Sequence, residues 1–98
     1  MRAMSNRRSK FELYREILSQ VKNGNYMMTK LMYGSNLSWN SFNQYFEPLV
    51  SQGLIRSIRM DENNGSRVKY FITEKGEICL ECLGLALNSV KLGDEINL

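Results

Sequence analysis

The sequence has 98 residues, of which 43% are hydrophobic and 23% are charged, and its formal net charge is +3. These values are ordinary for a globular chain of one domain and exclude a disordered or fibrous protein. The chain has no histidine, the commonest general base, and it has neither a phosphate-binding glycine loop nor a nucleophile elbow. We therefore expect a protein that is not an enzyme and that uses no metal or cofactor.

The charged residues are unevenly distributed along the chain. Residues 1–46 hold seven basic and two acidic side chains, residues 47–73 hold four and three, and residues 74–98 hold two and five. A basic front and an acidic end favour a polyanionic partner. We expect a cytoplasmic protein, because no apolar run follows the basic N-terminal residues and none is long enough to span a bilayer.

Three helices are predicted in the first half of the chain. Ser9 begins a capping-box pattern ahead of a helix that Gly24 should end. Apolar residues at helical spacing predict a short second helix at Met27–Met32. Ser38 can cap a third helix, which Gly53 should end.

A hairpin and a last helix follow. Leu54–Met60 and Arg67–Thr73 are rich in β-branched and aromatic residues, and Asn64-Gly65 between them is a strong hairpin-turn signal. Thr73 can then cap a helix with acidic residues in its first turn. The chain is thus divided into a basic arm (1–8), a domain of three helices and a hairpin (9–73), a last helix (74–92) and a tail (93–98).

Five motifs mark this order of elements, namely Thr29–Tyr33, Leu37-Ser38, Tyr45–Leu49, Gly53–Ile55 and Tyr70–Gly76. Together they resemble the archaeal winged helix-turn-helix family of transcriptional regulators, which includes small chromatin-associated DNA-binding proteins that dimerise through a C-terminal coiled coil. The resemblance covers roughly residues 8–87. It implies an α+β winged helix-turn-helix fold of three helices, a β-hairpin wing and a C-terminal dimerisation helix.

Two features depart from the family pattern. The last helix is expected to be shorter than in the coiled-coil proteins, with Gly84 within it and Gly93 just beyond its end. Pro48 lies inside the third helix, where proline removes a backbone donor and clashes with the preceding turn, so a kink or a local break is predicted there.

The third helix is the predicted recognition helix. Its apolar side chains face the core, and its opposite side is polar. A polar side is found on any amphipathic helix exposed to solvent, and also on a helix that contacts DNA bases. Asn and Gln can pair with an adenine edge in the major groove, and Ser can pair with several bases. The predicted reading residues are Asn40, Ser41, Asn43, Gln44 and Ser51, with Glu47 beside them. Thr29 and Ser38, at the starts of the second and third helices, are also expected to contact DNA, whereas Trp39 is expected to pack against the second helix.

Basic residues on several elements are predicted to contact phosphates, which position a DNA-binding protein without reading the sequence. Any one of them can also be a solvated charge, but as a set they favour DNA. The predicted phosphate contacts are Arg7, Arg8, Lys10, Lys30, Arg56, Arg59, Arg67 and Lys69. Because Asp61 and Glu62 at the wing tip would repel phosphates, we expect the wing to contact DNA through its stems.

The last helix is apolar almost all round. One side can pack on the domain, and a partner subunit is the simplest cover for the other, so a homodimer is predicted. The periodicity does not say which stripe meets the partner. The predicted interface residues are Ile78, Cys79, Leu80, Cys82, Leu83, Leu87 and Val90.

Cys79 and Cys82 have three interpretations. Two subunits could supply four thiolates to a zinc ion, or the cysteines could form a disulfide between subunits. The favoured interpretation is that both are small apolar residues packed in the helix interface, since the chain has no other cysteine and no histidine to complete a metal site.

The sequence therefore predicts a dimeric winged-helix protein that binds double-stranded DNA in the nucleoid and regulates transcription. Two alternatives use the same fold. One is an architectural chromatin protein that coats DNA with little sequence preference, and the other is a module that binds another polypeptide.

Overall fold

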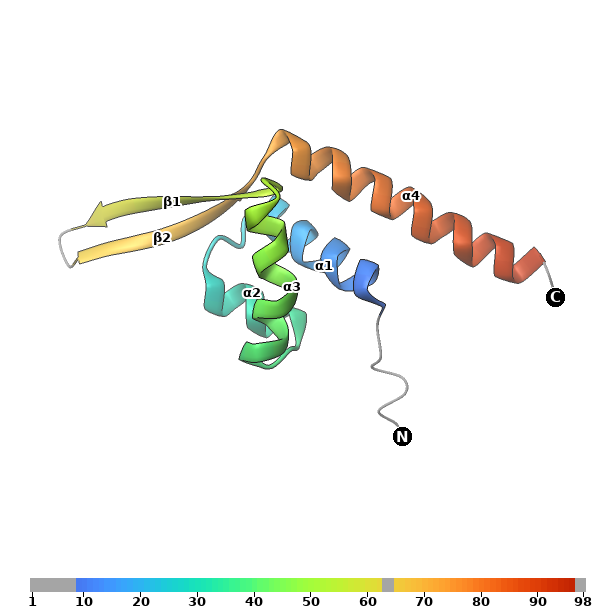
Figure 1. Ribbon diagram of the computed structural model, residues 1–98, viewed down its shortest axis with the longest axis horizontal. Coiled ribbons are helices and arrows are strands. Elements are labelled where there is room, and N and C mark those ends of the chain that lie inside the picture. Colours follow the sequence, from blue (N-terminus) through green and yellow to red (C-terminus); the bar gives the residue numbers. More distant parts are fainter. Residues whose placement is uncertain (1–8, 63–64, 97–98) are drawn as a thin grey trace.

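The computed structural model describes residues 9–62 and 65–96, of which 62, 66 and 89–96 are described by their backbone alone (Figure 1). The predicted arm, with Arg7 and Arg8, lies outside these residues. Three helices, a two-stranded antiparallel hairpin and a long last helix follow one another in the predicted α+β order. The elements are α1 (Lys10–Lys22), α2 (Met28–Ser35), α3 (Trp39–Ser51), β1 (Ile55–Glu62), β2 (Gly65–Ile72) and α4 (Glu74–Ile96).

The helix ends confirm the local signals in the sequence. The Ser9 hydroxyl accepts a hydrogen bond from the Glu12 amide at 3.1 Å, and the Glu12 carboxylate accepts one from the Ser9 amide at 3.4 Å, which completes the capping box of α1. α2 ends at Asn36, whose φ of 58° reverses the chain in the left-handed region. Ser38 caps α3 as predicted.

α3 runs through Pro48 as one helix, so the predicted local break is wrong. Pro48 has no amide hydrogen, so the helix lacks the hydrogen bond that this residue would donate to the preceding turn. The Pro48 carbonyl still accepts a hydrogen bond from the Gln52 amide at 2.9 Å. Phe46 and Leu49, on either side of the proline, are both buried. Their burial holds this part of the helix against the core and offsets the missing bond.

The hairpin is longer than predicted. Its register runs from Ile55 opposite Ile72 to Glu62 opposite Gly65, so the connection is residues 63–64 alone. Of the predicted turn pair Asn64-Gly65, Gly65 already belongs to β2, and Asn64 lies outside the described residues. The glycine has a φ of 116°, which an L side chain rarely adopts.

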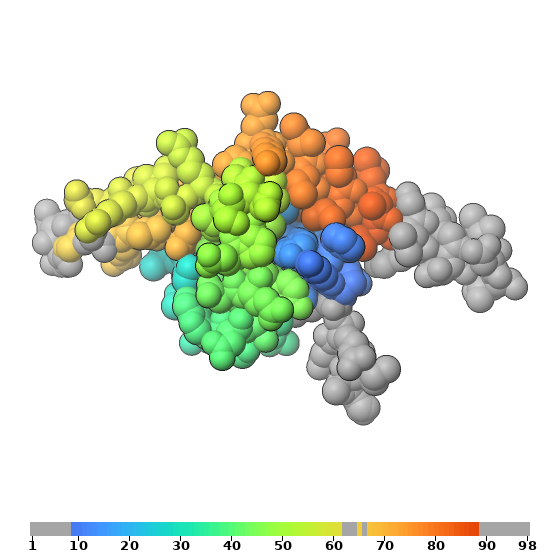
Figure 2. Space-filling model, viewed as in Figure 1, coloured from blue at the N-terminus to red at the C-terminus, as the bar shows by residue number. Residues whose placement is uncertain are grey.

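The core lies between the three helices and the start of the hairpin. Phe42 and Phe46 of α3 stack with ring centroids 5.0 Å apart, and Phe46 meets the ring of Tyr70 edge-on at 4.9 Å. The wing and α4 lead away from this body on opposite sides (Figure 2). The other core residues are Ile17, Leu18, Val21, Leu31, Leu49 and Ile55.

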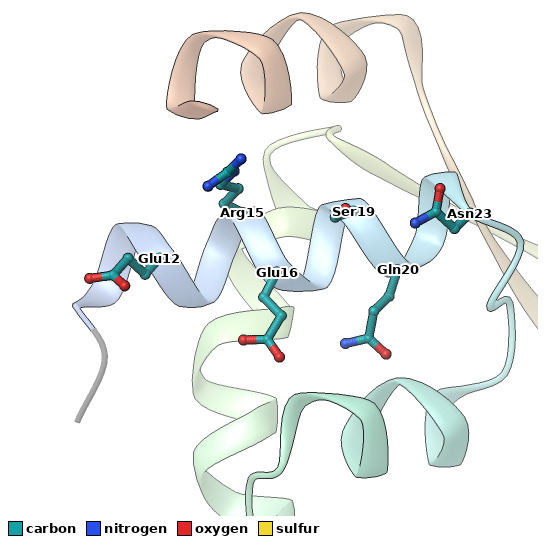
Figure 3. A pocket seen from close by; sticks show the side chains of 6 residues that line it. All are labelled: Glu12, Arg15, Glu16, Ser19, Gln20 and Asn23. Carbon is teal, nitrogen blue, oxygen red and sulfur yellow. The ribbon is translucent and has the colours of Figure 1, made fainter. Parts of the chain in front are cut away.

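A buried polar link joins α1 to α2. Ser35 is fully buried, and its hydroxyl accepts a hydrogen bond from the Gln20 amide at 2.9 Å and donates one to the Leu31 carbonyl at 2.8 Å. Asn25 donates to the Gln20 carbonyl oxygen at 3.3 Å, so the amide of Gln20 is used at both ends. The side chain of Gln20 points from α1 toward α2 (Figure 3), and the link fixes the position of α2.

One joint connects the end of α3, the hairpin and the start of α4. The Thr73 hydroxyl accepts from the Gly76 amide at 3.0 Å, which caps α4, and donates to the Gly53 carbonyl at 2.7 Å. Gly76 is buried against the Leu54 carbonyl with no room for a Cβ atom. The close approach of α4 to the hairpin therefore depends on this glycine.

α4 lies along α1 and continues beyond the predicted end at 92 (Figure 1). It includes residue 93 and ends at Ile96, so Gly93 does not end the helix and residues 93–96 do not form the predicted tail. Lys22 of α1 pairs with Glu77 of α4 at 3.7 Å. In the described part of the chain, no helix combines the length and the apolar character that a membrane span needs.

We expect Gly76→Ala to lower the free energy of unfolding by about 1–3 kcal/mol, because the added methyl group overlaps the Leu54 carbonyl oxygen and the hairpin must shift. Gly84→Ala is the matched control. Its methyl group would lie 3.8 Å from the Arg15 side chain, and alanine favours a helix over glycine by up to about 1 kcal/mol. Urea unfolding followed by circular dichroism measures both, and equal effects of the two variants would contradict this account of the joint.

Candidate nucleic-acid interface

The outer face of α3 presents a row of polar side chains. Because Phe42 and Phe46 point into the core, the residues on the opposite side of the helix face solvent. Asn40 and Gln44 are exposed on that side, and Asn43 is half-buried next to the hairpin. Figure 2 shows the surface of α3, in green, between the yellow wing and blue α1. Two amide side chains are thus exposed on the outer face, and a third is half-buried.

Two of the residues predicted to contact DNA, Ser38 and Ser41, form the cap at the start of α3. The Ser38 hydroxyl accepts from the Ser41 amide at 3.3 Å and donates to the Ser41 hydroxyl at 3.1 Å. Both residues therefore satisfy each other at the helix N-terminus. Ser51, at the other end, is exposed, and its hydroxyl donates to the Pro48 carbonyl at 3.3 Å.

Two aromatic side chains are exposed near the start of α3. Trp39 is 51% exposed and is not part of the packed core, so it is less covered than a side chain packed against the second helix was expected to be. Its position explains the difference, because Trp39 is the first residue of α3 and the buried stripe begins only at Phe42. Tyr33, near the end of α2, is 75% exposed and was not among the predicted site residues. The sequence patterns assign apolar residues to the core and give no signal for these exceptions.

A groove separates α3 from the hairpin. Asn43, Glu47 and Ser51 of α3 line one side, and Ser57 of β1 lines the other. Its floor is apolar and includes the half-buried Tyr70, whose pKa is raised by burial. The remaining lining residues are Met28, Phe46, Val50 and Val68. The groove thus has a polar rim that α3 and β1 share.

The basic residues predicted to contact phosphates lie on elements other than α3. Thr29 and Lys30 are exposed in the first turn of α2, whereas α3 has no lysine or arginine and Glu47 as its one charged residue. Lys10 begins α1, which Figure 1 places on the far side of the body from the wing. The structure therefore does not bring Lys10 together with the cations of the wing.

The wing carries cations on both faces. Arg59 is opposite Val68, on the face that continues from Ser57 and Tyr70, whereas Arg67 and Lys69 alternate onto the other face. Arg56 shares that other face, opposite Phe71. The Lys69 ammonium lies 4.7 Å from the centre of the Tyr26 ring, so part of its charge is used within the protein.

α4 divides its apolar residues between two faces. Cys79, Leu80 and Leu83, which the sequence assigns to the dimer interface, are partly buried and pack against the core of their own domain. Ile78 is 60% exposed, and Leu85, which the predicted interface omitted, is 64% exposed.

The remaining predicted interface residues fall in different places. Cys82 is exposed and Leu87 is half-buried, while the side chain of Val90 lies outside the described residues. Ile78, Cys82 and Leu85 recur every three to four residues on one side of α4, and we call them the α4 stripe. Both cysteines are free thiols; Cys79 is half-buried against the core of its own domain, and Cys82 is exposed.

The winged-helix class of proteins is defined by three helices, of which the third is a recognition helix with a polar outer face, followed by a hairpin wing. The winged helix-turn-helix family model matches residues 7–89, and the chain belongs to this family. MJ0287, an uncharacterised protein of Methanocaldococcus jannaschii, is 35% identical over 71 residues. The matched part is 72% of this chain and 65% of MJ0287, so the chain spans just under two thirds of that relative.

Solved structures share the fold at lower identity. A Streptococcus transcriptional regulator superposes with a TM-score of 0.73 at 14% identity, over 88% of this chain and 91% of the other. Sso10a-2, a DNA-binding protein from Sulfolobus solfataricus, superposes with a TM-score of 0.63 at 22% identity, over 92% and 94%. These likenesses show a shared architecture over most of the chain.

We expect Ser38→Ala to lower the free energy of unfolding by about 1 kcal/mol, because the Ser41 amide loses its hydrogen-bond acceptor. Ser38→Asp restores an acceptor and should keep the stability close to that of the wild type. Chemical unfolding of the three proteins tests this role. A Ser38→Ala variant as stable as the wild type would show that the hydroxyl does not cap α3.

Proposed function

We propose that the chain binds double-stranded DNA with sequence preference and acts as a transcriptional regulator. The observation that carries the proposal is the outer face of α3, where Asn40 and Gln44 are exposed beside a wing rich in cations. A helix of this width fits the major groove, and its amides can form paired hydrogen bonds with adenine edges.

The separation of charge from hydrogen-bonding groups supports this proposal. α3 offers amides and hydroxyls but no cation, whereas Lys30 lies on α2 and Arg59 and Arg67 lie on the wing. Phosphate contacts from the flanking elements would position α3, and α3 would read the bases. A protein with this role works at the chromosome, so the proposal places it in the nucleoid.

The proposal includes no catalytic activity. A hollow on α1 is lined by the side chains of that one helix (Figure 3), including Glu12, Arg15 and Glu16. Glu12 is already used in the helix cap, and the chain has no histidine that could serve as a general base there. The solved structures with the same fold are named as regulators and DNA-binding proteins, which supports a binding role.

We also propose that two chains pair through the α4 stripe. Ile78 and Leu85 leave more than half of their surfaces uncovered, although the opposite side of α4 already packs on the domain. In the sequence, Leu92 lies seven residues after Leu85 and Ile96 four residues after Leu92, with the polar Ser89 at the position between Leu85 and Leu92, and the helix extends to Ile96. This spacing is typical of a coiled-coil seam, so a second copy of α4 is the proposed occupant.

We expect the protein to bind a duplex of about 30 base pairs with an affinity that falls steeply as salt rises. With about four phosphates neutralised by each subunit, the log–log slope for a dimer should be about −7. Fluorescence anisotropy of a labelled duplex gives the slope, and the emission of Trp39, the one tryptophan, should change on binding.

Two results would change the proposed function. The lack of any binding at low salt would favour a module that binds protein. Equal affinity for a selected site and for random DNA would favour the architectural role.

We expect Leu85→Glu to convert dimers into monomers at tens of micromolar, because it places a charge in the apolar seam. Tyr33→Glu is the matched control, since it also puts a carboxylate at an exposed apolar position but lies on α2. Sedimentation equilibrium should give twice the mass of the chain for the wild type and the control. A wild-type monomer, or a Leu85→Glu dimer, would contradict pairing through the α4 stripe.

A further inference from the structure

Glu47 is the one charged residue of α3, and it lies in the row of polar side chains on the outer face. Asn40 is two turns before it and Ser51 one turn after it, so the three residues share one side of the helix. Glu47 also lines the groove toward the wing, together with Asn43. Its carboxylate is therefore placed among the groups that the proposed function assigns to base reading.

Among the residues that the structure describes, Glu47 forms no ion pair that would stabilise the protein. Residues three and four positions away on α3 are neutral, so no helical ion pair is available. In the described part of the chain, no lysine or arginine lies within ion-pair distance of Glu47. It is also far from the first turn of α3, where a helix dipole would stabilise a negative charge.

A carboxylate at this place limits what α3 can contact. It accepts hydrogen bonds and donates none, so it is repelled by phosphates and by the acceptor atoms of guanine and thymine. Two donors face the major groove, the cytosine N4 amino group and the adenine N6 amino group. Adenine presents its N7 acceptor beside N6, which opposes the second carboxylate oxygen, whereas cytosine has no acceptor there.

We propose that Glu47 is a specificity-determining residue that selects a cytosine in the major groove. This inference rests on the proposed DNA binding and goes beyond it by naming one base of the site. Asn40 and Glu47 are about 10 Å apart along the helix axis, at 1.5 Å per residue. The cytosine therefore lies within the same half-site as the bases that Asn40 and Gln44 contact.

The same carboxylate lowers the affinity for DNA without the site. When the cytosine is absent, Glu47 has no donor to pair with and faces acceptors and phosphates, so binding to random sequence is opposed. The lack of cations on α3 strengthens this discrimination, since no neighbouring charge on the helix neutralises Glu47.

The test is selection from a random duplex library, followed by anisotropy on the selected site and on the same site with the cytosine pair changed to T·A. The wild type should prefer the C·G pair at one position of each half-site by about tenfold or more. Glu47→Ala should lose this preference at that position alone and bind random DNA at least as tightly as the wild type. Glu47→Gln should shift the preference to adenine, because its amide can pair with N6 and N7.

Glu81→Gln is the control, since it removes the same charge from an exposed position on α4 and should leave the selected sequence unchanged. Circular dichroism of each variant confirms that α3 is folded. A cytosine preference that survives in Glu47→Ala, or an equal loss of affinity on every sequence, would overturn the role of Glu47 while leaving DNA binding intact. A wild type that binds no duplex would overturn the proposed function and this inference together.

Discussion

The packing of the aromatic side chains of α3 is the interaction on which the arrangement of the domain depends. Phe42 and Phe46 stack on each other inside the core, and Phe46 meets Tyr70 of the wing edge-on. These contacts fix both the rotation of α3 about its axis and its position relative to the hairpin. The polar outer face and the groove beside it are consequences of this buried side, since a different rotation would bury the amides and expose the rings.

Much of the fold could be predicted from the sequence because its signals are local. Ser9, Ser38 and Thr73 mark helix starts through hydrogen bonds that span only three residues, and these are properties of the chain next to each cap. The sites that sequence reasoning missed depend on contacts between distant segments. Helical periodicity identifies the inward side of α3, but it does not reveal that Trp39 lies beyond the end of the core.

The assignment of α4 shows the same limit. An apolar helix has several stripes of equal hydrophobicity, and the sequence cannot show which of them α1 covers. The structure partly buries the side of Cys79 and Leu83 and leaves that of Ile78 and Leu85 exposed. Pro48 and Gly93 are a related case, because both residues are helix breakers by propensity and both helices continue through them.

The joint at Thr73 has a consequence for the geometry of any DNA site. A single hydroxyl binds the end of α3 through the Gly53 carbonyl and the start of α4 through the Gly76 amide, so both helices are held at one point. In a dimer paired through α4, the distance between the two copies of α3 would then be fixed by the rigid connection of each α3 to its α4. Such a protein measures the separation of two half-sites, and an insertion of a few base pairs between them costs one of the two contacts.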